Sequence, residues 1–141
     1  MNHNRKSTPV RRGAAMVELA FCLPILFSVV FAIMEFSRNL QLQQTVREAA
    51  FEGARAGITL NAATSDVNAA AIAITNVAGI QNPTITVNPS QLTYTSPTVS
   101  VTVATTPASN GWFLWFFNSG SVISATITLS REVQAVSFPA S

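Results

Sequence analysis

The sequence is dominated by one apolar run near its N-terminus. About 20 residues, Ala14 to Ile33, are almost all apolar, and only Glu18 and Pro24 interrupt them. A helix of that length, rising about 1.5 Å per residue, crosses a hydrocarbon core of about 30 Å. We therefore predict a membrane-spanning helix that carries a carboxylate inside the apolar run.

The distribution of charge gives this span a direction. Four of the eight Lys and Arg residues precede Gly13, whereas the chain from Ala14 onward has four Arg against six acidic residues. By the positive-inside rule, we expect a cytoplasmic N-terminus and an exported C-terminus. Because the basicity is confined to the N-terminal segment, it does not form a nucleic-acid surface, and we expect no nucleic-acid partner.

The apolar run does not have the form of a removable secretory signal. Such signals have an apolar core of about 7 to 15 residues followed by a small-x-small cleavage site. Here the core is longer, and Met34, Glu35 and Phe36 follow it. We expect the span to be retained, so that the rest of the chain is anchored in the membrane.

The span continues into an amphipathic helix. Neither Pro nor Gly interrupts residues 25–52, so we predict one continuous helix from about Ala15 to about Ala56. Its outer half carries a row of small residues, Ala49, Gly53 and Gly57, that allows close approach of another backbone. Two alternatives remain open for this row: contact with a helix of another subunit, or packing on the chain's own C-terminal domain.

Charged residues outside the span are few. Glu35 with Arg38, and Glu52 with Arg55, are spaced as i, i+3 pairs, which we expect to be exposed ion pairs worth about 0.2 to 0.5 kcal/mol each. Beyond residue 66 the chain has just two charged residues. A domain with so little charge is expected to have low solubility on its own, so we expect it to contact other molecules.

The C-terminal part predicts an α+β head domain. A second, shorter helix is expected from Asp66 to about Ala78, capped by Thr64 or Ser65 and ended by Gly79. After Pro83 the apolar residues alternate with Thr and Ser. They are Ile85 and Val87, then Val99, Val101 and Val103, then the odd positions from Ile123 to Ala135.

This alternation predicts a small antiparallel sheet of three or four strands with one buried face. Arg131 falls on the apolar side of the last strand. We expect a bulge, a strand end or a snorkelling side chain there rather than a buried ion pair.

A run of large apolar residues, 112–117, follows Gly111. It is too short to span a membrane and lacks the alternation of a half-buried strand. Three interpretations remain open: part of the core, a patch that packs on a neighbouring subunit, or an anchor in the outer membrane interface, which Trp favours. The residues of this candidate contact patch are Trp112, Phe113, Trp115 and Phe116.

The sequence offers little for catalysis. Its one His precedes the span, its one Cys lies within the span, and no acidic cluster has metal-ligand spacing. We therefore expect a protein that is not an enzyme, with no cofactor and no metal. The alternative to a structural subunit is an uncleaved, single-span, membrane-anchored protein that adheres to a surface or binds a ligand.

Glu18 has a particular place relative to Gly13. If the bond after Gly13 were cut, Ala14 would carry a new α-amino group and Glu18 would be the fifth residue of the mature chain. A carboxylate there can neutralise the N-terminal amine of an adjacent helix, in surroundings where an unpaired charge is expensive. Glu18 is thus the candidate assembly residue, and Gly13 and Ala14 are the candidate processing site.

These features together resemble a known family. The elements are Arg11-Arg12-Gly13 with the following AAMVE, Pro24, Glu35-Phe36 and the later AAFEGAR, residues 49–55. They are similar to the TadE-like pseudopilins, minor pilins of bacterial tight-adherence (Tad, Flp-type) pilus systems with a type IV prepilin-like N-terminus. The resemblance implies cleavage after Gly13 by a prepilin peptidase. The implied partners are that peptidase, other pilins or pseudopilins, the inner-membrane assembly platform and membrane lipid.

The predicted organisation has four parts. Residues 1–13 form a basic leader peptide, 14–36 a transmembrane helix, 37–57 the amphipathic extension of that helix, and 58–141 an exported α+β head. The expected location is the bacterial inner membrane, crossed once, with incorporation in an extracellular pilus as the further expectation from the resemblance.

Overall fold

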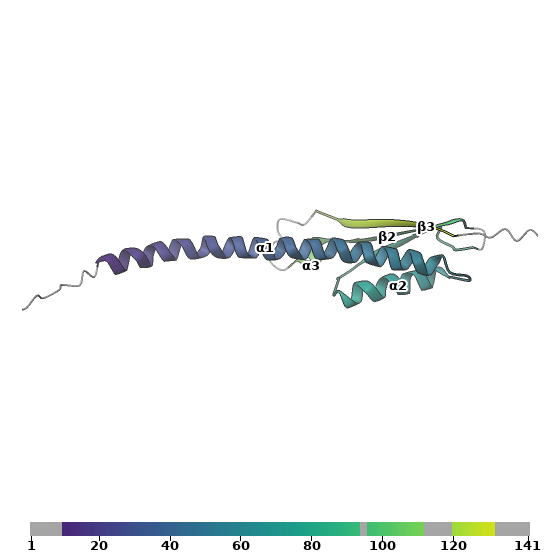
Figure 1. Cartoon of the computed structure of the whole chain (residues 1–141), viewed down its shortest axis with the longest axis horizontal. Coiled ribbons are helices and arrows are strands. Elements are labelled where there is room, and N and C mark those ends of the chain that lie inside the picture. Colours follow the sequence, from purple (N-terminus) through teal and green to yellow (C-terminus); the bar gives the residue numbers. More distant parts are fainter. Residues whose placement is uncertain (1–9, 94–95, 112–119, 132–141) are drawn as a thin grey trace, which may run out of the picture.

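The long helix, α1, is the axis of the molecule. The computed structural model describes residues 10–93, 96–111 and 120–131, with side chains from Gly13 onward. Within it α1 spans Val10–Gly57, 48 residues that continue through Pro24, a length of about 70 Å. One continuous helix is therefore confirmed. Its N-terminal half extends alone, and its C-terminal half carries the head (Figure 1).

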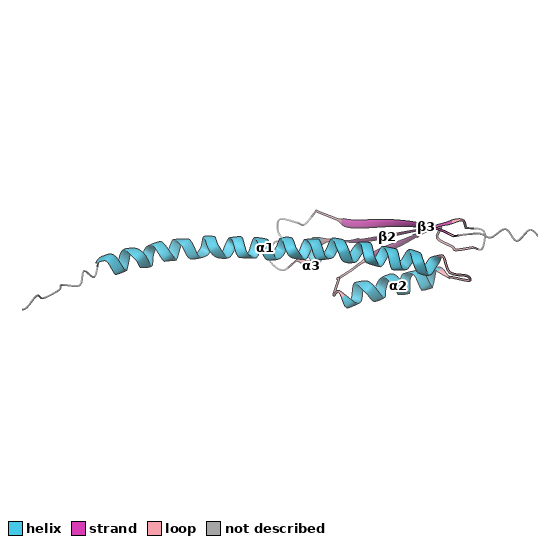
Figure 2. Cartoon of the chain, in the orientation of Figure 1, coloured by secondary structure: helices cyan, strands magenta, loops and turns pink. Residues whose placement is uncertain are grey.

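In its described residues, the head combines two further helices with one sheet. The helices are α2, Thr64–Val77, and the short α3, Pro107–Asn110. The strands are β1, Thr84–Asn88; β2, Thr98–Thr105; and β3, Ile123–Ser130. They form an antiparallel sheet in the order β1-β2-β3, beside α1 (Figure 2). The predicted α+β architecture is confirmed, and of the three or four strands expected, three lie in the described residues.

The two faces of the sheet differ in chemistry, as the alternation predicts. On the inner face Val99, Val101 and Val103 of β2 are fully buried. On the outer face, hydroxyl groups pair across the strands. The Oγ1 atoms of Thr102 and Thr126 lie 2.7 Å apart, and Thr128 donates to the Oγ of Ser100 at 3.0 Å. Hydroxyl groups therefore keep the outer face of the sheet polar without charge.

The second helix begins differently from the prediction. Its N-cap is Ala63, whose backbone N–H donates to Oδ2 of Asp66 at 2.9 Å. The Thr64 hydroxyl, expected to cap, instead donates to the carbonyl of Ser90 at 2.9 Å. The predicted cap at Thr64 or Ser65 is wrong, because a loop distant in sequence supplies an acceptor for this hydroxyl. Gly79, with φ of 67°, follows the end of α2 as predicted.

Arg131 lies just after β3 and closes the C-terminal end of α1. Its Nη2 donates to the carbonyls of Gly57 and Thr59, at 2.8 and 3.2 Å, and its Nε donates to that of Ile58 at 3.3 Å. The last carbonyls of a helix have no partner within the helix, and a cation there also interacts favourably with the helix dipole. A strand end was one of the predicted explanations for Arg131 on the apolar side of the sheet. From that position its guanidinium also caps the C-terminal end of α1.

Replacing Arg131 with Met should therefore destabilise the head. Met keeps much of the apolar stem but removes every donor, so we expect a loss of about 1–3 kcal/mol in the free energy of unfolding. Urea unfolding of the detergent-solubilised chain measures this loss. Arg55→Met is the control, since Arg55 is exposed and pairs with Glu52 at 3.5 Å. Equal losses in the two variants would contradict the capping role.

Candidate assembly surface on the long helix

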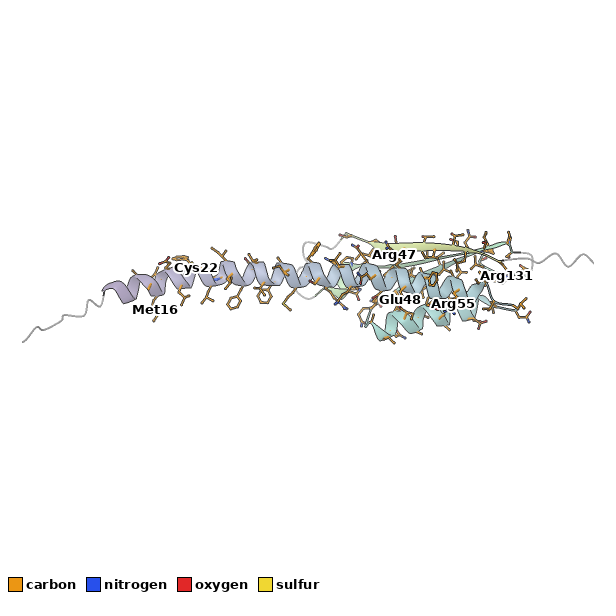
Figure 3. All side chains as sticks on the ribbon, in the orientation of Figure 1. Met16, Cys22, Arg47, Glu48, Arg55 and Arg131 are labelled. Atoms are coloured by element: carbon orange, nitrogen blue, oxygen red, sulfur yellow. The ribbon has the colours of Figure 1, made fainter. Side chains whose placement is uncertain are left out.

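The N-terminal half of α1, residues 13–34, is bare, which means that no other described part of the chain covers it. Every residue from Gly13 to Met34 is exposed, and the large apolar side chains radiate from the helix on all sides (Figure 3). Within the described part of the chain, this is the one helix long and apolar enough to cross a membrane. An apolar surface of this size needs lipid or other helices around it.

The candidate processing site lies inside the helix. We expected the helix to start near Ala15, but α1 begins at Val10 and therefore includes the Gly13–Ala14 bond. A Cβ added at Gly13 would meet nothing within 4 Å. The bond lies near the helix start, where the first N–H groups have no partner within the helix and opening costs little.

Glu18 lies about one helical turn beyond Ala14, on the bare half of the helix. It is exposed, and no described cation forms an ion pair with its carboxylate. A carboxylate among apolar residues is costly without a partner. The structure thus leaves this group accessible to a partner from outside the chain.

The row of small residues occupies a different place. Ala49, Gly53 and Gly57 are all buried on the side of α1 that faces the head. A Cβ added at Gly53 would lie 3.3 Å from Val101 Cγ1 and 3.4 Å from the carbonyl oxygen of Val67. Within this chain the row is occupied by the head itself, the second of the two alternatives.

A further close approach occurs at Gly57. A Cβ added there would lie 2.8 Å from Val99 Cγ1 and 3.1 Å from Val67 Cγ2. Distances below about 3 Å are not compatible with undisturbed packing of a β-carbon. The row therefore fixes how closely β2 and α2 approach α1, and in this way positions the head on the helix.

A polar joint near the end of the apolar run was missed by the sequence reasoning. Glu35, predicted to be an exposed ion-pair residue, is buried with 5% exposure, and its Oε1 lies where a side chain on Gly111 would be. Arg38 donates through Nε to the carbonyl of Asn110 at 3.3 Å. The prediction for Glu35 is wrong because the turn after α3 covers it.

Asn110 is the centre of this joint. Its Oδ1 accepts the N–H of Gln81 at 2.7 Å, and its Nδ2 donates to Thr105 Oγ1 at 3.0 Å and to the carbonyl of Thr106 at 2.9 Å. With 5% exposure it is almost completely buried. Its sequence context, a polar stretch after a proline, predicts no more than a loop, so nothing local identifies it as a structural residue.

Other candidate chemistry gives no site. The aromatic patch, Trp112, Phe113, Trp115 and Phe116, lies outside the described residues. Among the residues that are described, no group of three or more His, Cys, Asp or Glu side chains could hold a metal ion. What the described chain brings together is a bare apolar helix, an accessible carboxylate and a head fixed to the outer half.

The comparison with known proteins found similarity within the long helix α1. Residues 13–55 match the family model described as TadE-like protein. Comparison with curated proteins found no match, and comparison with solved structures found none either. The matched segment begins at Gly13 and covers nearly all of α1 but not the head. Over that segment the chain is similar to TadE-like proteins, and the segment contains the described helix that is long and apolar enough to cross a membrane.

Proposed function

We propose that this chain is a minor pilin, or pilus assembly subunit, of a Tad-type pilus. In this proposal a prepilin peptidase cuts the Gly13–Ala14 bond on the cytoplasmic side of the inner membrane. The mature chain then assembles through α1, with the head projecting into the periplasm and onward into the fibre. Its partners are the peptidase, other pilins or pseudopilins, the assembly platform and membrane lipid, and it is not an enzyme.

One observation carries the proposal. The family match starts at Gly13, directly before the bare apolar half of α1, on which Glu18 is exposed. An anchor alone requires an apolar helix but no carboxylate within it. The position of Glu18, one turn beyond the proposed new terminus, gives that carboxylate a chemical role.

The role follows from electrostatics. Cleavage creates an α-amino group at Ala14, and an unpaired ammonium in apolar surroundings is as costly as an unpaired carboxylate. When two mature helices lie side by side, Glu18 of one and Ala14 of the other can neutralise each other. This pairing favours assembled helices over isolated ones, because each isolated helix retains both charges without partners.

The processing step is tested by substitution at Gly13. We expect Gly13→Val to lower the processed fraction by at least about tenfold, because a β-branched side chain beside the scissile carbonyl displaces it from the peptidase's catalytic groups. The mass of the chain isolated from a host with the peptidase measures the processed fraction. Gly120→Val is the control, since Gly120 also has open space around its Cβ position. Full processing of Gly13→Val would contradict the proposed site.

We also propose that the aromatic patch contacts the outer leaflet. The patch follows Gly111 directly in the sequence, and Gly111 lies against Glu35, next to the last residue of the predicted span. Trp112 and Trp115 are the chain's only tryptophans. Fluorescence of the protein in vesicles should therefore be quenched by lipids brominated near the headgroup, because Trp prefers the membrane interface. Emission quenched by aqueous acrylamide alone would contradict this contact.

A further inference from the structure

The described residues of the head leave one side of the outer half of α1 uncovered. Leu42 and Val46 face the core and are fully buried, whereas Leu40 and Phe51 are 42% and 46% exposed. Beside these two exposed residues, a groove of about 510 Å³ runs between α1 and β3, and Ile127 contributes its strand wall. We call this hollow the α1–β3 groove.

Polar side chains extend the groove along β3. Gln43 and Arg47 line the groove and also line an adjoining hollow of about 270 Å³ beside Ile123 and Ala125. Arg47 is exposed, and it projects from α1 beside the sheet (Figure 3). The groove is thus apolar at Leu40, Phe51 and the strand, and Arg47, Glu48 and the amides of Gln43 and Gln44 lie between these apolar parts.

The groove lies on the same helix face as Glu18. Steps of three or four residues keep side chains on one face of an α-helix. From Glu18 such steps lead without interruption to Phe51, and every residue on the path is exposed. The path is Glu18, Cys22, Ile25, Val29, Ile33, Phe36, Leu40, Gln43, Arg47 and Phe51. The open side of the head is therefore a continuation of the surface that begins at Glu18.

We propose that the α1–β3 groove receives α1 of a second copy of this chain. This inference rests on the proposed function, because the pairing of Glu18 with the amine of Ala14 sets its register. Two parallel helices paired in that way are displaced by four residues, about 6 Å. Each residue of the second copy then lies beside the residue four positions later in the first.

The groove is complementary to the second copy at this displacement. Gln43 of the second copy lies beside Arg47 of the first, and an amide oxygen accepts from a guanidinium. Arg47 of the second copy lies beside Phe51 of the first, and a guanidinium over an aromatic ring is attractive. Both contacts are favourable between two identical chains.

Cysteine cross-linking tests the occupant and the register. Two differently tagged full-length copies, both with Cys22→Ala, are co-expressed in a host with the intact Tad system. One carries Leu40→Cys and the other Gln44→Cys, positions four residues apart that leave Gln43 and Arg47 in place. We expect the two tagged copies to become disulfide-linked on mild oxidation. The matched control pairs Leu40→Cys with Asn76→Cys, an exposed position on α2, and should not cross-link.

Two outcomes overturn the proposal. One is no cross-link between the Leu40→Cys and Gln44→Cys copies while pili form. The other is an equal yield with the Asn76→Cys control. In either case normal processing and loss of pili in Glu18→Gln would leave the proposed function standing, so the two failures are distinguishable.

Charge reversal gives a second, independent readout. Arg47→Glu should lower the cross-linking yield by about tenfold, because it removes both contacts of the guanidinium and places a carboxylate against the electron-rich face of the ring. Arg55→Glu, an equal change in charge at an exposed arginine beyond the groove, should lower it less than about twofold. Limited proteolysis of each processed variant shows whether its head folds. Equal effects of the two variants would overturn the role of the groove.

Discussion

Replacing Glu18 with Gln is expected to abolish assembly while leaving cleavage after Gly13 intact. The substitution keeps the shape of the side chain and removes its charge, so the amine of an adjacent Ala14 is left without a counter-charge in apolar surroundings. Breaking a buried pair in this way costs about 3–5 kcal/mol, a factor of about 100 or more in association. No other single change on α1 is expected to reduce assembly as strongly.

The measurement is the yield of sheared pili, or of the chain in pilus fractions, against the amount of processed chain in the membrane. Glu52→Gln is the matched control, because it also removes one carboxylate from α1 but at the outer end, where Glu52 pairs with Arg55. Normal assembly of Glu18→Gln would contradict the proposed pairing of Glu18 with the amine of Ala14. A loss of processing equal to the loss of assembly would place Glu18 in peptidase recognition instead.

A large effect on stability is expected for Gly53→Leu. At Gly53 the added β-carbon already lies 3.3 Å from Val101 and 3.4 Å from both Ala71 Cβ and the Val67 carbonyl oxygen. The remaining atoms of a leucine have no space unless α2 and β2 move away from α1. We expect a cost of about 3 kcal/mol, at the upper end of the range for overpacked cores.

Urea unfolding and limited proteolysis of the solubilised chain measure this loss. Gly120→Leu is the control, because a Cβ there has no neighbour within 4 Å. The proteolysis should release fragments of the head while the apolar half of α1 stays intact, since the head alone depends on this contact. Equal stability of the two leucine variants would contradict the packing described here.

Local pattern predicted the elements of the fold. The long helix and the strands have strong periodicity, and these signals depend on neighbours within a few residues. The alternation of Val with Thr and Ser on β2 was enough to predict which face is buried, and the structure agrees. The same reasoning selects Gly13 and Glu18 as candidates, because their proposed roles depend on their spacing from one another.

Contacts between residues that are far apart in the sequence could not be predicted in this way. Arg131 donates to Gly57, 74 positions away, and Glu35 is buried by the turn at Gly111. The row of Ala49, Gly53 and Gly57 left two alternatives open because small side chains suit any close backbone, whether from another helix or from the chain's own strands. Only the packing of the head on α1 distinguishes them.

The most direct test of the account is the intact mass of the wild-type chain isolated from its host with the Tad system present. The account predicts a chain that begins at Ala14, because processing must create the amine that Glu18 neutralises. A mass that still includes residues 2–13 would contradict it, and would favour an uncleaved membrane-anchored protein that adheres to a surface or binds a ligand.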